Sequence, residues 1–246
     1  MNFDENSIYT LMHGDHGDPF AVLGPHAEDG AWIVRALLPG AVSVEIVQGT
    51  TILAGLARQG DSDVFAGSVP GPVQYQLRVD WGTHQQTIDD PYRFAPVLGE
   101  LDLWLLAEGT HYRPYEKLGA HLLEHDGVHG VNFAVWAPNA QRVSVVGNFN
   151  HWDGRRHVMR KRGPSGIWEI FLPGVVAGDL YKFEIKTQAG ELLRKADPYA
   201  FRAELRPDTA SVVAALPPVA PISDERRHAN GLTSPISIYE VHLGSW

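Results

Sequence analysis

The sequence contains no cysteine among its 246 residues, and this absence excludes disulfide bonds, thiolate metal sites and cysteine catalysis. Long apolar runs are also missing: a run such as residues 103–107 is far shorter than the ~20 residues that a membrane-spanning helix needs. The first residues have neither the basic region nor the apolar stretch of a secretory signal peptide. We therefore expect a cytoplasmic protein without a membrane partner.

Basic residues are scarce in the first part of the chain. Residues 1–110 hold four arginines and 15 acidic residues, whereas residues 111–246 carry a net charge of +2. The whole chain has a net charge of −9, so a nucleic-acid partner is not expected. A step in charge of this kind is typical of two separately folding units.

Glycine and proline are abundant, with 25 and 17 residues. This many turn-forming residues favours short strands over long helices. Apolar and polar side chains alternate over residues 75–81 and 181–185, and this period of two predicts half-buried strands. Further strands are predicted over residues 32–37, 42–47, 64–69, 131–136, 142–147 and 167–172.

Three short motifs occur twice in the same order, which indicates an internal repeat. The pairs are Leu23-Gly24 with Leu118-Gly119, Pro70-Gly71 with Pro173-Gly174, and Asp90-Pro91-Tyr92 with Asp197-Pro198-Tyr199. Their offset grows from 95 to 103 to 107 residues, as loop insertions in the second copy would produce, and one insertion is expected at residues 148–162. With turn signals roughly every ten residues, the sequence predicts an all-β chain of two tandem immunoglobulin-like antiparallel β-sandwiches.

Helices are expected at residues 5–13 and 101–108, where Asp102 would cap the first turn. We interpret residues 101–115 as the segment that joins the two modules. A proline-rich stretch after residue 215 predicts a linker, because proline continues neither a helix nor a β-ladder. Residues 236–243 then predict a lone strand, which either adds to a sandwich edge or opens a further domain.

Several segments resemble the bacterial 1,4-α-glucan (glycogen) branching enzymes of the α-amylase-type glycoside hydrolase superfamily. They are residues 106–111, 115–121, 133–140, 146–152 and 195–200, the segment from Pro235 to Trp246 and, more weakly, residues 18–26. The segment from Pro235 resembles the opening strand of the catalytic (β/α)₈ barrel of these enzymes. The resemblance implies an N-terminal β-sandwich module at 1–105, a glycogen-binding-type module at 106–215, a linker at 216–235 and the first strand of a truncated barrel at 236–246.

The resemblance also implies a function, that of the non-catalytic N-terminal half of a branching enzyme. Such an enzyme transfers α-1,4-glucan chains to 6-hydroxyls and uses one carboxylate as nucleophile and a second carboxyl as acid and base. The family motifs that carry these carboxylates do not occur in this sequence, and we interpret Glu240 as a structural residue. We therefore expect no catalysis by this chain alone, no cofactor, and two partners: an α-glucan such as glycogen or amylose, and the catalytic barrel of the same enzyme.

Two other functions stay open. The chain can be a stand-alone two-domain glycan-binding or scaffold protein, or the N-terminal part of a debranching or trehalose-releasing enzyme of the amylase family. The strand predicted at residues 236–243 argues against a scaffold, which has no reason to end there.

The candidate glucan site is the polar loop at residues 148–152. A sugar stacks its CH-rich face on an aromatic ring, while its hydroxyls bind fixed donors and acceptors. Trp152 would supply the ring, Asn148 and Asn150 would supply polar groups, and the resemblance places Lys182 beside the tryptophan. The alternative is that Trp152 folds back as a loop anchor and that Lys182 is an ordinary solvated charge.

One departure from the family weakens this site. Related glycogen-binding modules place a second tryptophan after a glycine in the following hairpin, whereas this chain has Leu192 there. Leucine cannot provide a stacking platform, so the resemblance implies a weak site.

Other conspicuous residues are interpreted as structural. Four tryptophans in strand segments are expected in the core or at an interface: Trp32, Trp81, Trp136 and Trp168. The basic residues at 155–162 predict a solvated hairpin. His121 and His125 have helical spacing but no further ligand close in sequence, so no metal site is expected.

Overall fold

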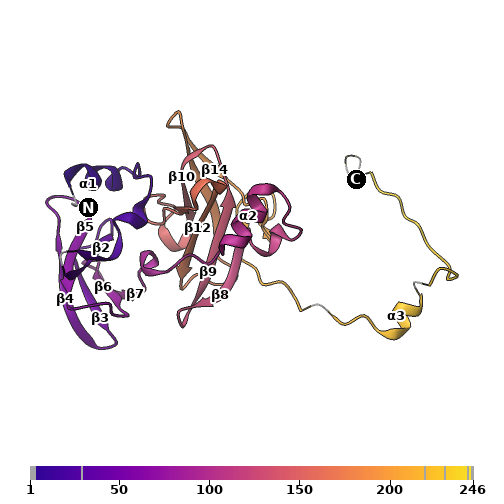
Figure 1. Cartoon of the computed structure of the whole chain (residues 1–246), viewed down its shortest axis with the longest axis horizontal. Helices are drawn as coiled ribbons and strands as arrows, with labels where there is room; N and C mark the ends of the chain where they lie inside the picture. Colours follow the sequence, from indigo (N-terminus) through magenta and orange to yellow (C-terminus); the bar gives the residue numbers. More distant parts are fainter. Residues whose placement is uncertain (1–3, 29, 219, 230, 243, 245–246) are drawn as a thin grey trace. The chain divides into compact units, whose positions relative to one another are not determined.

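We describe the fold from a computed structural model, which covers residues 4–28, 30–218, 220–229, 231–242 and 244. The chain divides into two compact units at Ala215 and Leu216. The first unit contains two β-rich modules, coloured indigo to magenta and magenta to orange in Figure 1. In the part of the chain that the structure describes, no helix is both long enough and apolar enough to cross a membrane.

The first module is one antiparallel sheet in the order β1-β2-β5-β4-β3-β6-β7. Its strands are β1 Gly24–Glu28, β2 Ala31–Leu37, β3 Ser43–Gln48, β4 Thr51–Arg58, β5 Val64–Val69, β6 Gln76–Asp80 and β7 Gln85–Ile88. Strand β4 pairs along most of its length with β3, but its last residues, Ala57 and Arg58, pair with β5. The sheet therefore folds over at β4 into two layers, and buried residues of β2, β3, β5 and β6 share one core.

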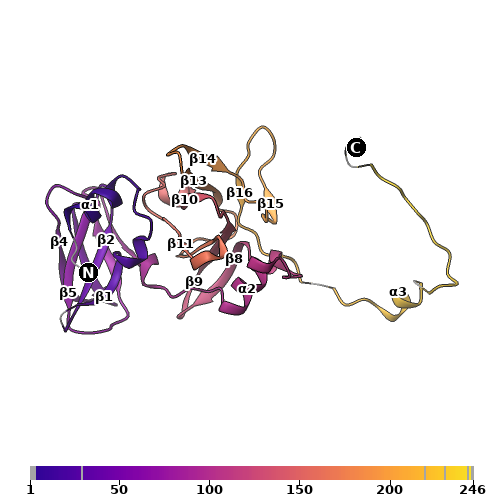
Figure 2. The same cartoon turned by 45° about the horizontal axis from the view of Figure 1, so that its top comes forward.

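The second module consists of two separate antiparallel sheets. One has the order β10-β13-β16-β15, with β14 also pairing with β13, and the other has the order β11-β12-β9-β8. Figure 2 shows β10, β13 and β14 apart from β8, β9 and β11. The strands are β8 Gly119–His125, β9 Val128–Trp136, β10 Ala140–Gly147, β11 Arg160–Lys161, β12 Ile167–Pro173, β13 Leu180–Thr187, β14 Leu192–Lys195, β15 Arg202–Ala203 and β16 Ser211–Val212. Residues of both sheets, such as Phe133 and Tyr181, form one core.

The predicted all-β class with two sandwich modules is confirmed. The strands predicted from the sequence correspond to β2, β3, β5, β6, β9, β10, β12 and β13. Residues 119–125 form strand β8, although His121 and His125 have helical spacing. They belong to a β-hairpin with β9, which Asp126 and Gly127 close with positive φ values of 50° and 77°.

The internal repeat extends to the start of each module. A helix, α1 Glu5–Met12 or α2 Glu100–Glu108, precedes a short 3₁₀ turn, η1 Pro19–Ala21 or η3 Pro114–Glu116. After the turn comes a glycine with positive φ, Gly24 or Gly119, at 86° and 103°. An added Cβ would lie 2.5 Å from the Tyr92 carbonyl oxygen in the first copy and 3.1 Å from that of Tyr199 in the second, so a side chain is excluded there.

The repeated Asp-Pro-Tyr motif closes each module in the same way. Tyr75 donates its hydroxyl to Asp90 Oδ2 at 2.6 Å, and the Tyr92 backbone N–H donates to Asp90 Oδ1 at 2.9 Å. Tyr181 and Asp197 repeat the first bond at 2.5 Å. Burial raises the pKa of both aspartates, and their tyrosine partners counteract this rise. In each module the motif thus buries a carboxyl group that accepts hydrogen bonds from nearby donors, as a buried polar group requires.

The expected insertion in the second copy interrupts one strand. Residues 51–58 form the continuous strand β4 in the first module. In the second module, Val158 makes an isolated bridge to Ser144 of β10, and β11 pairs with β12. The equivalent of β4 is therefore split, and residues 148–157 form a loop before it, with η4 Asn148–Asn150 at its start.

Helix α2 packs against the second module. Leu103 shares a buried cluster with Leu118, Ala134 and Ile167, so the helix is more than a connecting segment. The helix begins after Gly99, and Asp102 does not cap it: its carboxylate contacts His111 at 3.2 Å and Lys117 at 3.0 Å. This packing favours a module boundary before α2, whereas the boundary at residues 105 and 106 remains a prediction.

The basic segment at residues 155–162 lies between the modules, so the prediction of a solvated hairpin is wrong. Three of its arginines donate to backbone carbonyls: Arg156 to Pro39 at 2.6 Å, Arg160 to Phe94 at 3.2 Å and Arg162 to Leu98 at 2.9 Å. Arg162 also pairs with the buried Glu169, whose other oxygen accepts from the Leu98 N–H at 3.0 Å. The arginines thus donate hydrogen bonds to backbone carbonyls that would otherwise lack a partner where the two modules pack together.

The second unit contains helix α3 Asp224–Ala229. The strand predicted at residues 236–243 is not confirmed. Residues 235–242 carry no regular secondary structure, and Leu243 lies outside the described residues. A strand needs a neighbouring strand to pair its backbone groups, and the described residues of this unit provide none.

Candidate functional site

The candidate loop follows β10 and is shaped by an unusual backbone. His151 and Trp152 both have left-handed φ angles, 57° and 59°. Such angles cost of order 1–3 kcal/mol for a non-glycine residue and persist when the surroundings enforce them. Here the Trp152 N–H donates to the Gly147 carbonyl at 3.0 Å, and the Asp153 N–H donates to the Asn150 carbonyl at 3.2 Å. The loop is therefore held in one conformation.

The indole of Trp152 is partly exposed and fixed at its polar end. Its Nε1 donates to Asn148 Oδ1 at 2.9 Å, and Asn148 is exposed. This bond orients the ring without burying it. Trp152 is therefore not fully packed into the core, and part of its surface stays accessible.

A buried ion pair between β10 and β13 supports the backbone of the loop. Arg142 and Glu184 meet at 2.8 Å, with 4% and 6% of their side chains exposed. Arg142 also donates to the Gly154 carbonyl at 2.8 Å, and Arg194 donates to Glu184 at 3.1 Å and to the Trp152 carbonyl at 3.0 Å. A Cβ on Gly154 would lie 1.9 Å from Glu184 Oε1, so only glycine lets the loop approach the pair this closely.

Lys182 lies on the strand next to the loop. It stands opposite Val146 in the β10–β13 register, and Gly147, the acceptor for Trp152, follows Val146 directly. Its Nζ donates to Thr209 Oγ1 at 2.7 Å, and its side chain is partly exposed. The structure thus places Lys182 and Trp152 at the same end of one strand pair.

Asn150 has a different environment from the one expected of a sugar ligand. It is 2% exposed. Its Oδ1 accepts from the Gly147 N–H at 2.9 Å, and its Nδ2 donates to the Val145 carbonyl at 2.8 Å and to His157 Nδ1 at 3.0 Å. Its polar atoms are used within the protein, so Asn150 holds the loop rather than facing a ligand.

His157 is the partner that sequence reasoning missed. Burial lowers its pKa to about 3, and the neighbouring Arg156 lowers it further. Its ring is therefore neutral. Because Nδ1 accepts from Asn150, the proton of the neutral ring is on Nε2. Neither Arg142 nor Glu184 was predicted, since both look like ordinary charges in strands of alternating pattern.

The remaining aromatic and hydrophobic candidates divide between core and surface. Trp168 is buried, as predicted, and Trp32 and Trp81 pack partly against the first core. Trp136 is 59% exposed, so it does not lie in the core, and a place at an interface stays a prediction. Leu192 is 56% exposed at the start of β14. Among the described residues, no group of three or more histidine, aspartate or glutamate side chains could hold a metal ion.

Two family models match this chain. Residues 4–92 match the alpha-1,4-glucan branching enzyme GlgB, N-terminal domain. Residues 117–200 match carbohydrate-binding module 48 (isoamylase N-terminal domain). The two matches fall on the first and the second β-module.

Solved structures of two pullulanases and of a putative alpha amylase are also similar to parts of the chain. A pullulanase complexed with maltotetraose from Anoxybacillus sp. LM18-11 is 18% identical over 89% of this chain and 28% of its own, with a TM-score of 0.34. Pullulanase type I from Bacillus subtilis str. 168 complexed with maltose is 19% identical over 81% and 28%, with a TM-score of 0.34. A putative alpha amylase from Salmonella typhimurium is 23% identical over 40% and 15%, with a TM-score of 0.32. This chain spans between 15% and 28% of the length of these three proteins.

The family matches confirm the resemblance that the sequence motifs indicated, and they fall on the two modules that the fold displays separately. The chain therefore has the organisation of the N-terminal portion of a branching enzyme, in which a branching-enzyme N-terminal domain is followed by a carbohydrate-binding module of family 48.

Proposed function

We propose that this chain binds α-glucan at the Trp152 loop and presents it to the catalytic domain of a glycogen branching enzyme. The observation that carries the proposal is the fixed, partly exposed indole of Trp152, locked by Asn148 and by the supported backbone of residues 147–154. A preorganised ring binds a sugar at a low entropic cost, because little side-chain freedom remains to be lost.

The site supplies both kinds of contact that a glucose unit needs. The indole face stacks on the apolar face of the sugar ring. Asn148 accepts from the indole with Oδ1 and has its amide N–H groups left to donate to hydroxyls. Lys182 Nζ has three protons and gives one to Thr209, so it can donate to a sugar hydroxyl as well. The site has one aromatic platform, because Leu192 stands where related modules have a second tryptophan, and its affinity for a single chain is therefore weak. Glycogen carries many equivalent chain ends, and this multivalency raises the overall affinity.

The match of residues 4–92 supports a branching enzyme over a debranching or trehalose-releasing one. In the proposed whole enzyme, α-1,4-glucan chains are transferred to 6-hydroxyls by a pair of carboxylates in the catalytic barrel. The family's catalytic motifs are missing from this sequence. The proposed division is an N-terminal module at 1–105, a glucan-binding module at 106–215, a linker at 216–235 and the beginning of the barrel at 236–246, in a cytoplasmic protein.

Electrophoresis in gels that contain glycogen tests the binding function. The wild-type chain should be retarded in proportion to the glycogen content, and Trp152→Ala should lose most of this retardation. Trp104→Ala is the matched control, because Trp104 is a 57% exposed tryptophan on helix α2, away from the loop. Equal retardation of wild type and Trp152→Ala contradicts the proposal. The chain alone should leave the iodine colour of amylose unchanged.

A further inference from the structure

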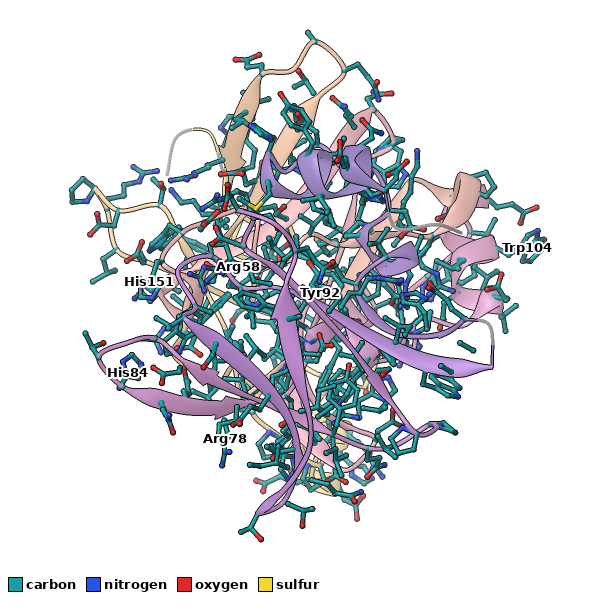
Figure 3. The ribbon with its side chains drawn as sticks, turned by 90° about the vertical axis from the view of Figure 1, so that its left-hand side faces the viewer. Arg58, Arg78, His84, Tyr92, Trp104 and His151 are labelled. Carbon is teal, nitrogen blue, oxygen red and sulfur yellow. The ribbon has the colours of Figure 1, made fainter. Side chains whose placement is uncertain are left out.

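A cleft of about 380 Å³ opens between the two modules. One wall comes from β7 and the residues after it, including Thr87, Ile88 and Tyr92. The other comes from the loop at residues 148–157, including His157, and from the end of β12 with the residues after it, including Val175. Figure 3 looks onto the first module, with Tyr92 near the centre of the view and His151 towards one edge. The cleft volume lies at the lower end of the ~300–1,000 Å³ that small-molecule sites occupy.

The cleft lining includes one hydrogen-bond donor, on His157, for which the described part of the protein shows no acceptor. His157 is neutral and its Nδ1 accepts from Asn150, so its remaining N–H is on Nε2. Arg156 donates through Nη2 to the Pro39 carbonyl, and its buried Nε lies 3.9 Å from Asp153 Oδ2, so the guanidinium is held in place at the cleft lining.

The charges around the cleft favour a neutral ligand. Arg156 contributes one positive charge, which its pair with Asp153 at 3.9 Å offsets, and Asp89 in the lining carries a carboxylate that already accepts from Gln76 and Arg93. Asp90 is enclosed with the Tyr75 hydroxyl. An anion would meet these carboxyl groups, and a cation would meet Arg156, so neither sign of charge is matched.

The surface of the cleft is mixed in the way that a sugar requires. Leu38, Ile88 and Val175 supply apolar surface to the lining, and Phe149 of the loop lines the cleft as well. Thr87 is exposed at the rim and supplies a hydroxyl. A glucosyl ring has an apolar CH face and an edge of hydroxyls, and both kinds of surface are present here.

We propose that this cleft is a second α-glucan subsite, which takes a short α-1,4-linked glucosyl segment between the two modules. His157 Nε2 donates to one of its hydroxyl oxygens, and the apolar wall contacts its ring faces. The proposal rests on the α-glucan ligand of the proposed function, but it concerns different residues from the Trp152 face of the loop. The same loop then contributes to two subsites, one on the outer surface and one between the modules.

Amide and indole NMR shifts of the full chain, titrated with maltotetraose, test the two subsites separately. In the wild type we expect saturable shifts both at cleft residues such as Ile88 and Gly174 and at the Trp152 indole. Thr87→Trp, which places a bulky ring at the rim, should weaken the cleft response by about tenfold or more and leave the indole response unchanged. The matched control is Thr83→Trp, because Thr83 is equally exposed but does not line the cleft.

The possible outcomes separate the two proposals. Trp152→Ala should abolish the loop response and retain the cleft response. Shifts at the indole without shifts in the cleft overturn the second subsite and leave the proposed function standing. Shifts in the cleft without shifts at the indole do the reverse. Cleft shifts that appear with inorganic phosphate but not with maltotetraose overturn the assignment of a neutral sugar.

Discussion

Replacement of Arg142 by methionine removes one partner of the buried pair below the Trp152 loop. Breaking such a pair on one side costs about 3–5 kcal/mol, because the other charge stays buried and uncompensated. Here Glu184 retains Arg194 at 3.1 Å on its second oxygen. We therefore expect the lower bound, a loss of about 3 kcal/mol in the free energy of unfolding. The Gly154 carbonyl also loses its donor, so the loop should become more mobile.

Urea unfolding followed by tryptophan fluorescence measures this cost, since Trp168 is buried in the same module. Arg194→Met is the matched control: it removes a contact to the same carboxylate, but from a side chain that is 52% exposed, and it should cost less than about 1 kcal/mol. A double variant, Arg142→Met with Glu184→Met, should be more stable than Arg142→Met alone. The desolvation argument is refuted if Arg142→Met costs no more than Arg194→Met.

Three further predictions concern the interior and the contact between modules. Because burial lowers the pKa of His157 to about 3, its contribution to stability is complete above the unfolded pKa near ~6.5 and is lost as the pH falls through it towards 3. Between pH 7 and pH 5, the free energy of unfolding should therefore fall by about 1–2 kcal/mol less in His157→Gln than in the wild type, as measured by urea titrations. An equal fall in both proteins would contradict this. Tyr75→Phe and Tyr181→Phe each remove the hydroxyl donor of a buried carboxyl, and each should cost about 1–3 kcal/mol in the same assay, whereas a cost in only one module would argue against equivalent roles. Arg156→Met removes the donor to the Pro39 carbonyl and should lower the unfolding free energy by about 1–2 kcal/mol in calorimetry; an unchanged midpoint would show that the contact contributes nothing.

The sequence was most informative where the side-chain period is two. In β6 and β13, buried positions alternate with partly exposed ones over most of the strand, so these strands could be predicted from the sequence. Strand β4 was not predicted, because most of its residues are exposed or half-buried and its end changes from one neighbour to another. The paired motifs revealed the repeat, but the bond from Tyr75, which lies outside these motifs, to Asp90 became visible only in the structure.

The candidate site was predictable in part. A tryptophan in a polar loop is visible in the sequence, whereas the bond from Trp152 to Asn148 and the left-handed backbone depend on the folded loop. Asn150 and Asn148 are alike in sequence, yet one is buried and the other exposed. Arg156 looks solvated because its acceptor, the Pro39 carbonyl, is 117 residues away in the chain. Local patterns do not reveal contacts at such separations.

Isothermal titration calorimetry with maltoheptaose, on wild type, Trp152→Ala and Trp104→Ala, tests the central claim most directly. The claim predicts measurable heat of binding for the wild type and for Trp104→Ala, and an affinity lower by about tenfold or more for Trp152→Ala. The same affinity in all three proteins, or no binding by a wild type that is fully folded, would contradict it.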